Sequence, residues 1–359
     1  MVSCFLSTAG VQSQILKDTA SMNLLKSGVD DIYSFRFDEA RDISERLSSI
    51  YPDHPVINLY SGMLTYWENY PLIPSSPSSV SYENYMTSCI KQCEEAQNPD
   101  DYAEYLLANL GARGMLLMYY ADNNLTDKVN PLIISTYRHV RESFDYTSVY
   151  SDFYFFTGLY NYYREAYPEA HPIYRMLAFL FPKGDREKGL KEMQNAGAYS
   201  IMLKAEAYSF LSYIFMSFEN NYQQSLAYTR GLHELYPDNL PYLAGYIKNL
   251  LLIKKYDEAE ITMASLIGET GNYYFEAQLA VFNGILEEKK YHNNIEAKRY
   301  YNKGISELSD FGYYGNDYSS IAYFGLSRIS GMNNDKQNRK TFRKMALELT
   351  SYKKINFDE

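Results

Sequence analysis

The chain has 359 residues with a net charge of −10, and it is 46% hydrophobic and 16% aromatic, including 39 Tyr. This composition excludes an intrinsically disordered chain, which would be depleted in aromatic residues. No uncharged apolar run approaches the roughly 18 residues that span a bilayer, and a negatively charged chain is a poor general binder of nucleic acid. The sequence therefore predicts a folded protein with no transmembrane segment and no nucleic-acid partner.

Residues 1–16 allow three interpretations. The stretch is apolar and rich in small residues, and Val11-Gln12-Ser13 is similar to the pattern that precedes a signal-peptidase cut, which predicts cleavage between Ser13 and Gln14. The basic residues that open a complete export signal are missing, so a frayed tail is the second interpretation. A lipid anchor on Cys4 is the third, although apolar residues follow it where a polar tether is usual.

From residue 17 onward the sequence repeats with a period near 34 residues. Three four-residue segments each consist of an aromatic residue, two polar residues and a small residue: Phe37-Asp38-Glu39-Ala40, Tyr222-Gln223-Gln224-Ser225 and Tyr256-Asp257-Glu258-Ala259. Further along two of these repeats, Tyr51-Pro52-Asp53 and Tyr236-Pro237-Asp238 occupy equivalent positions. A period of this length indicates stacked pairs of helices.

These residues resemble the tetratricopeptide repeat (TPR), whose pattern has an aromatic residue, then a small residue, then a Pro that ends the second helix. Asn294-Ile295-Glu296-Ala297 and Arg186-Glu187-Lys188-Gly189 look like further copies, while the early Trp of the pattern is missing throughout. The resemblance implies an all-α fold, a right-handed α-α superhelix. The chain is also similar to uncharacterised exported TPR proteins of Bacteroidota, which implies a periplasmic or cell-envelope location; a cytoplasmic location is the alternative.

The periodicity predicts about eight helix pairs in one repeat domain, residues 17–351, followed by a tail, residues 352–359. The predicted pairs are 17–50, 56–97, 101–144, 149–197, 199–235, 239–268, 272–309 and 317–351. The small residue of each repeat is expected where two helix axes approach closely, because only a methyl group or less fits there. These repeat-packing residues are Ala40, Gly189, Ser225, Ala259 and Ala297.

Two insertions interrupt the repeats. The first, residues 71–79, is rich in Pro and Ser and predicts a surface loop. The second, at about 162–183, is strongly aromatic, so it is expected to be a functional loop or a segment that folds back to close a gap. Its candidate residues for binding a ligand or partner are Tyr160, Tyr163, Arg164, Glu165, Tyr167, His171 and Tyr174.

Metal and nucleotide sites are not expected. The five His residues are spread over five repeats, and Cys89 and Cys93 have the spacing of neighbouring thiols on one helix rather than of a metal site with His. The Gly-rich segment 184–189 lacks the Gly-Lys-Ser/Thr of a phosphate loop. The sequence predicts no cofactor and no metal, and Asp185 is expected to cap the helix that follows.

The resulting functional prediction is a noncatalytic TPR scaffold that binds a protein or peptide through a concave, Tyr-rich groove. Of the positions that would grip a terminal carboxylate, only Lys248 carries a suitable side chain, which favours an aromatic or apolar groove. A glycan- or small-ligand-binding protein that uses the aromatic residues of 150–181 is the alternative. A hydrolase with Glu165 or His171 as acid or base is the third possibility.

Overall fold

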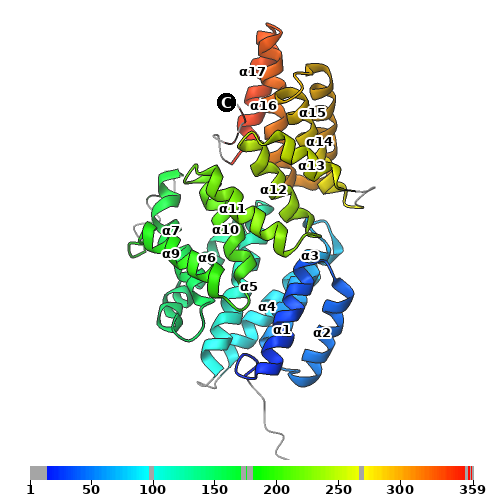
Figure 1. The fold of residues 1–359 in the computed structure, drawn as a ribbon. Coiled ribbons are helices and arrows are strands. Elements are labelled where there is room, and N and C mark those ends of the chain that lie inside the picture. The colour runs from blue at the N-terminus through cyan, green and yellow to red at the C-terminus, as the bar shows by residue number, and fades with distance from the viewer. Residues whose placement is uncertain are drawn as a thin grey trace, which may run out of the picture. The chain divides into compact units, whose positions relative to one another are not determined.

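A computed structural model describes residues 14–96, 101–170, 175, 181–266, 271–351, 355 and 357. These residues form helices joined by short turns, and none of them lies in a β-strand (Figure 1). Among them, no helix combines the length and the apolar character needed to cross a membrane. The fold class is therefore all-α, as the sequence predicts.

The chain divides into two compact units. Unit 1 contains residues up to Asn69 together with Pro77–Leu116, and unit 2 contains Tyr70–Ser76 together with Leu117–Glu359. The helices of unit 1 are α1 (Thr19–Tyr33), α2 (Phe37–Ile50), α3 (Pro55–Glu68), α4 (Pro77–Glu95) and most of α5 (Tyr102–Asp122). Within this unit α1 packs on α2, and α3 packs on α4.

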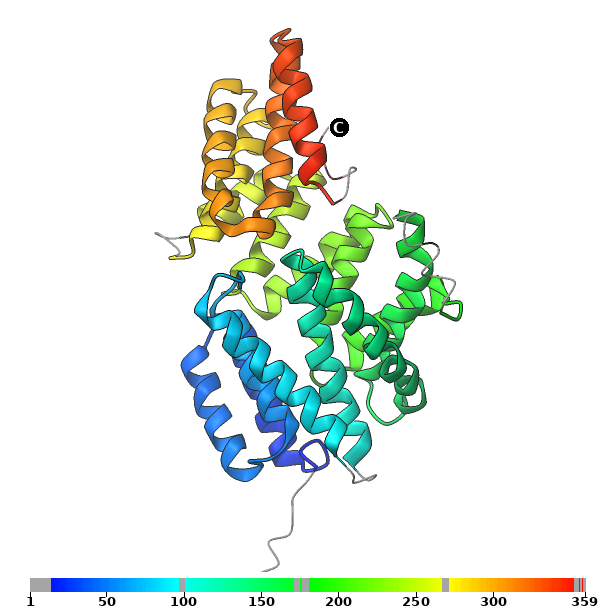
Figure 2. The same cartoon turned by 180° about the vertical axis from the view of Figure 1, so that it is seen from behind.

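Unit 2 contains the remaining helices. They are α6 (Thr126–Ser143), η2 (Phe144–Tyr146), α7 (Phe153–Ala170), α9 (Arg186–Tyr199), α10 (Lys204–Ser217), α11 (Tyr222–Leu235), α12 (Leu240–Leu252), α13 (Tyr256–Ala264), α14 (Tyr273–Lys289), α15 (Asn294–Leu308), η4 (Ser309–Gly315), α16 (Asn316–Met332) and α17 (Lys336–Leu349). Successive helices pack on each other, and α14 to α17 run side by side in both views (Figures 1 and 2).

The predicted helix pairs are confirmed. Within the described residues, each of the eight predicted ranges holds a pair of helices, with ends that differ from the prediction by a few residues, and the range 149–197 also holds the helical residue Arg175. The aligned four-residue segments mark the start of the second helix, because α2 begins at Phe37, α11 at Tyr222 and α13 at Tyr256. A helical-repeat architecture follows from this register.

In six of the eight pairs the turn between the helices has a recurring geometry that the sequence did not reveal. After α12, Lys254 has a φ of 63°, and its N–H donates to Leu251 while the N–H of Lys255 donates to Leu250. These two bonds satisfy the last carbonyls of the helix in the Schellman arrangement. The residue two positions before the second helix also has a positive φ at Phe35, Asn124, Asn220, His292 and Asn334.

The small repeat residues lie in the interior. Ala40, Ser225, Ala259 and Ala297 have no exposed surface, and Gly189 is buried. At Gly189 two helix backbones approach each other closely, because a Cβ built on it would lie 2.5 Å from the backbone nitrogen of Tyr162. The larger hydrophobic core of unit 2 is shared by α11 to α16.

Both insertions contain helical and buried residues, although residues 71–76 form a loop with Pro74 and Ser75 exposed, as predicted. Helix α7 continues through residues 162–170, because Tyr162 and Ala166 are buried one turn apart against Ile214 of α10. This packing keeps the last turns helical despite Pro168. In the first insertion Leu72 is fully buried, and α4 already begins at Pro77.

Candidate functional site

The predicted binding residues on α7 hold the connection to α9 in place. The guanidinium of Arg164 donates to the carbonyl of Phe181 at 3.2 and 3.1 Å, and Glu165 accepts the N–H of Gly184 at 3.0 Å. Tyr160 donates its hydroxyl to the carbonyl of Pro182 at 2.7 Å. These contacts support the interpretation that the insertion folds back on the repeats.

The other predicted residues divide into two groups. Tyr163 is packed against Phe218, with ring centres 5.4 Å apart, and Tyr167 keeps 37% of its surface exposed. His171 and Tyr174 lie outside the described residues. The structure thus brings Tyr160, Tyr163, Arg164, Glu165 and Tyr167 together on one helix, and the first four make the packing or hydrogen-bond contacts just given.

A polar network beside these residues was not predicted. Glu219, just beyond α10, accepts the hydroxyl of Tyr162 at 2.6 Å and the guanidinium of Arg186 at 2.9 Å. Arg186 also pairs with Glu169 at 3.0 Å. In the sequence, Arg186 stands at the repeat position where other copies have an aromatic residue. This departure from the repeat pattern was the one sequence signal that could have pointed to the network.

A second aromatic group in unit 2 is more open. The tyrosine cluster consists of Tyr70, Tyr274, Tyr314 and Tyr318, of which Tyr274 is buried and the other three are half-buried. The ring of Tyr274 lies 6.2 Å from Tyr70, 6.3 Å from Tyr314 and 6.4 Å from Tyr318. Its hydroxyl donates to the carbonyl of Tyr314 at 2.8 Å.

Three charged side chains accompany the tyrosine cluster. The ammonium of Lys248, on α12, lies 5.3 Å from the ring centre of Tyr318. Asp317 precedes Tyr318 at the start of α16, and Asp122 ends α5. Neither Lys248 nor Asp122 forms a hydrogen bond or an ion pair with another described residue. Both side chains nevertheless feel the charge of Asp317.

The surrounding protein shifts the pKa values of these groups. Water reaches Asp122, yet the protein packed around it displaces much of its hydration, and together with the nearby Asp317 it raises the pKa of Asp122 to about 7. The same loss of hydration lowers the pKa of Lys248, and Asp317 partly opposes this effect. By its exposed surface Lys248 is half-buried, whereas Asp122 is exposed.

Glu206 and Tyr242 extend this polar region. Glu206, on α10, is half-buried, and its Oε2 atom has no hydrogen-bond partner among the described residues. Burial raises the pKa of Glu206 to about 8, so the carboxyl is largely protonated near neutral pH. The pKa of Tyr242, on α12, is raised mainly by burial and secondly by the charge of Glu206. This effect indicates that Glu206 lies close to α12.

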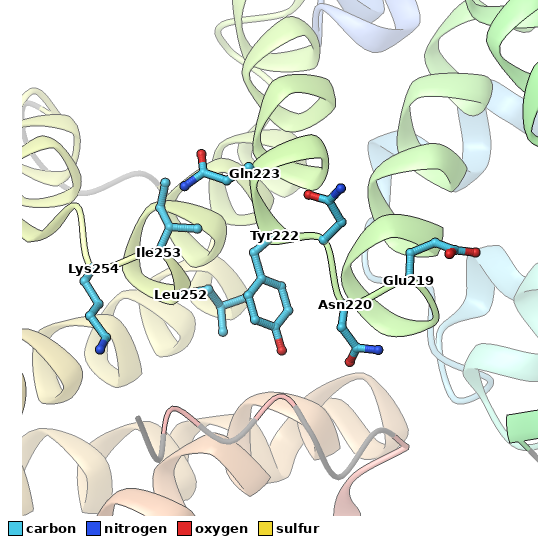
Figure 3. A pocket seen from close by; sticks show the side chains of 8 residues that line it. Glu219, Asn220, Tyr222, Gln223, Leu252, Ile253 and Lys254 are labelled. Atoms are coloured by element: carbon cyan, nitrogen blue, oxygen red, sulfur yellow. The ribbon is translucent and has the colours of Figure 1, made fainter.

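An open pocket of about 570 Å³ lies between two neighbouring turns of unit 2 (Figure 3). Its lining comes from the α10–α11 turn and the α12–α13 turn: Glu219, Asn220, Asn221, Tyr222, Gln223, Leu252, Ile253 and Lys254. Figure 3 shows the ring of Tyr222 between the apolar side chain of Leu252 and the amide of Asn220. The pocket thus combines one aromatic ring with several amides.

Metal-binding chemistry has no support in the part of the chain that the structure describes. No group of three or more His, Cys, Asp or Glu side chains could hold a metal ion there. Cys89 and Cys93 are free thiols in unit 1, and Cys89 is fully buried.

Comparisons with known proteins do not assign the chain to a family. No model of a protein family matches the chain, and the search of curated proteins found no match. The functional argument therefore rests on the residues and their geometry.

Proposed function

We propose that the protein is a noncatalytic scaffold of the TPR type that binds another protein through the tyrosine cluster. The observation that carries this proposal is the set of half-buried rings Tyr70, Tyr314 and Tyr318. Beside them lie Lys248 and Asp122, which form no hydrogen bond or ion pair with another described residue. Tyrosine offers a large contact area with few rotamers to order on binding. The charges beside the rings add specificity, because a matching partner must present complementary charges to them.

The position of the tyrosine cluster supports the same proposal. Lys248, Tyr274 and Tyr318 lie on α12, α14 and α16, the first helices of three successive pairs. A surface built from equivalent helices of stacked repeats is extended, and helical-repeat proteins use such surfaces to bind partners. By contrast, Arg164 and Glu165 on α7 are already hydrogen-bonded within the fold.

Partner capture with matched variants tests the proposal. Tyr318→Ala and Lys248→Ala are each expected to weaken capture of the partner by about tenfold or more, because Tyr is a frequent binding hot spot and the loss of Lys248 would leave a charge of the partner without its counterpart. Tyr273→Ala is the control: Tyr273 is next to Tyr274 on α14 but is 78% exposed and outside the cluster. Equal capture by all three variants would overturn the proposal, provided that circular dichroism shows each one folded.

Small-ligand binding is the second candidate function, and the pocket around Tyr222 favours it. An aromatic ring with amides in a space of about 570 Å³ suits a sugar or another polar ligand. In a ligand screen Tyr222→Ala would then abolish binding that Tyr318→Ala leaves intact. This pair of variants separates the two functions.

A further inference from the structure

Helix α17 carries positive charge along one face. Its basic stripe consists of five exposed side chains: Lys336, Arg339, Lys340, Arg343 and Lys344. Counted from the first of them, the others follow at three, four, seven and eight positions, a spacing that places all five on one side of a helix. The stripe extends over about 12 Å, at a rise of about 1.5 Å per residue.

Another face of α17 is fixed on α16. The hydroxyl of Ser320 donates to the carbonyl of Ala346 at 2.9 Å, and the hydroxyl of Ser327 donates to the carbonyl of Arg339 at 2.9 Å. The ring of Phe342 stacks on that of Tyr323, with centres 6.2 Å apart. The apolar side of α17 is therefore occupied within the fold, and the basic stripe remains at the surface.

The described residues leave the basic stripe largely without counter-charges. Lys336, Arg339 and Lys340 form no side-chain hydrogen bond or ion pair with another described residue. The ammonium of Lys344 lies 3.7 Å from a carboxylate oxygen of Glu348, but the two side chains are 77% and 62% exposed, so water screens this pair strongly.

The equivalent helix of the preceding pair is different. On α15, Arg299 pairs with Glu296 at 2.7 Å, and Lys303 pairs with Glu307 at 3.8 Å. The cations of α15 thus have acidic neighbours one turn away along the same helix. On α17 the residues four positions apart within the stripe are both basic.

Stability and solubility do not account for the basic stripe. Like charges four residues apart on a helix repel each other and destabilise it. The outer face of a terminal repeat must be polar, but mixed charges such as those of α15 meet this need. Of the chain's 34 basic and 44 acidic residues, 29 and 43 lie outside α17, so the stripe also opposes the charge of the rest of the protein.

We propose that the basic stripe of α17 docks a short acidic segment of a partner protein, whose carboxylates pair with the exposed lysine and arginine side chains. Complementary charge of this kind gives an interface its specificity and its rate of association. This surface does not include the tyrosine cluster, and the inference does not depend on the function proposed for that cluster.

The size and surroundings of the basic stripe favour an acidic segment over other anions. A nucleic acid would extend beyond the 12 Å stripe over a chain that is otherwise acidic, which would repel it. Insertion into an anionic membrane requires a free apolar helix face, and Phe342 and Ala346 of α17 are already packed on α16. A segment with a few carboxylates matches the stripe in both length and charge.

Binding of rhodamine-labelled hexaglutamate, followed by fluorescence anisotropy at low salt, tests the proposal with the full-length chain. The double variant Lys336→Gln with Lys340→Gln should bind the peptide at least about fivefold more weakly than wild type. Arg299→Gln with Lys303→Gln is the matched control, because it removes two exposed positive charges from α15. The control should change the affinity less than about twofold. Equal weakening by the two double variants would overturn the proposal, and so would the absence of binding to wild type.

Competition separates the proposed occupant from other anions. Six-nucleotide single-stranded DNA and vesicles rich in phosphatidylserine should displace the labelled peptide less effectively than unlabelled hexaglutamate does. More effective displacement by either one would contradict an acidic protein segment as the occupant. Tyr318→Ala should bind the peptide as wild type does. If the peptide tests fail while Tyr318→Ala still weakens partner capture, the docking surface on α17 is wrong and the proposed function stands.

Discussion

Gly158 of α7 and Gly189 of α9 let the backbones of their helices touch. A Cβ built on Gly189 would lie 2.9 Å from the carbonyl oxygen of Gly158 and 2.5 Å from the nitrogen of Tyr162. Because both obstacles are backbone atoms, they cannot move aside as a side chain would. The crossing of α7 and α9 therefore depends on the absence of a side chain at Gly189.

Gly189→Ala is expected to lower the free energy of unfolding by about 3 kcal/mol, since the two helices must separate to admit the methyl group. Gly245→Ala on α12 is the matched control, because the nearest atom to its Cβ would be 3.7 Å away, in Thr229. That substitution should raise the stability by about 0.5–1 kcal/mol, as Ala restricts the unfolded chain. Urea denaturation of both variants measures the difference, and effects of the same sign would contradict the packing.

Ala259→Glu tests the repeat register on α13. The side chain has no exposed surface, so the substitution buries a carboxyl group without a partner and should cost about 3 kcal/mol or more. Ile261→Glu on the same helix is the control: this residue is 71% exposed, and its replacement should change stability by less than about 0.5 kcal/mol. Thermal melts that show both variants unchanged would mean that the register is wrong.

His292→Gly tests the turn inside the last-but-one helix pair. His292 is exposed and has a φ of 56°, a conformation that glycine adopts without the steric cost of a Cβ. Glycine relieves the steric strain of the left-handed conformation in the folded state, and this relief outweighs the conformational entropy that glycine adds to the unfolded chain. The free energy of unfolding should therefore rise by about 0.5–1 kcal/mol. A decrease in the denaturation midpoint would argue against the left-handed turn.

Glu206→Gln should change how stability depends on pH. The folded-state pKa of Glu206 is raised to about 8 from 4.5, so its contribution to stability is complete below pH 4.5 and is lost as the pH rises towards 8. The neutral amide should remove this loss, which makes the variant more stable than wild type at pH 8.5 by about 2 kcal/mol. Denaturation curves at pH 5 and 8.5 check this, and an unchanged pH dependence would contradict the burial of the carboxyl.

The repeat pattern predicted most of the architecture. The segments that begin with Phe37, Tyr222 and Tyr256 identify the start of second helices because local sequence fixes a helix end. The extension of α7 to Ala170 could not be predicted, since it depends on contact between Tyr162 and Ile214, which lie 52 positions apart. The long interval between repeats was therefore interpreted as a loop.

The candidate site was only partly predictable. Lys248 stands out in the sequence from its position in the repeat, yet its neighbour Tyr318 lies 70 residues further on. With 39 Tyr in the chain, composition does not distinguish the rings of the tyrosine cluster from those in the core. Only the folded arrangement brings Tyr70, Asp122 and Asp317 into one region of unit 2.

Site-specific photo-crosslinking tests the proposed binding surface most directly. A photoreactive phenylalanine analogue at position 318 lies in the tyrosine cluster, whereas the same analogue at position 273 lies on the exposed side of α14. We expect irradiation with the partner to give one prominent adduct from position 318 and little or none from position 273. Adducts of equal yield at the two positions, or an adduct at position 273 alone, would contradict binding through the tyrosine cluster.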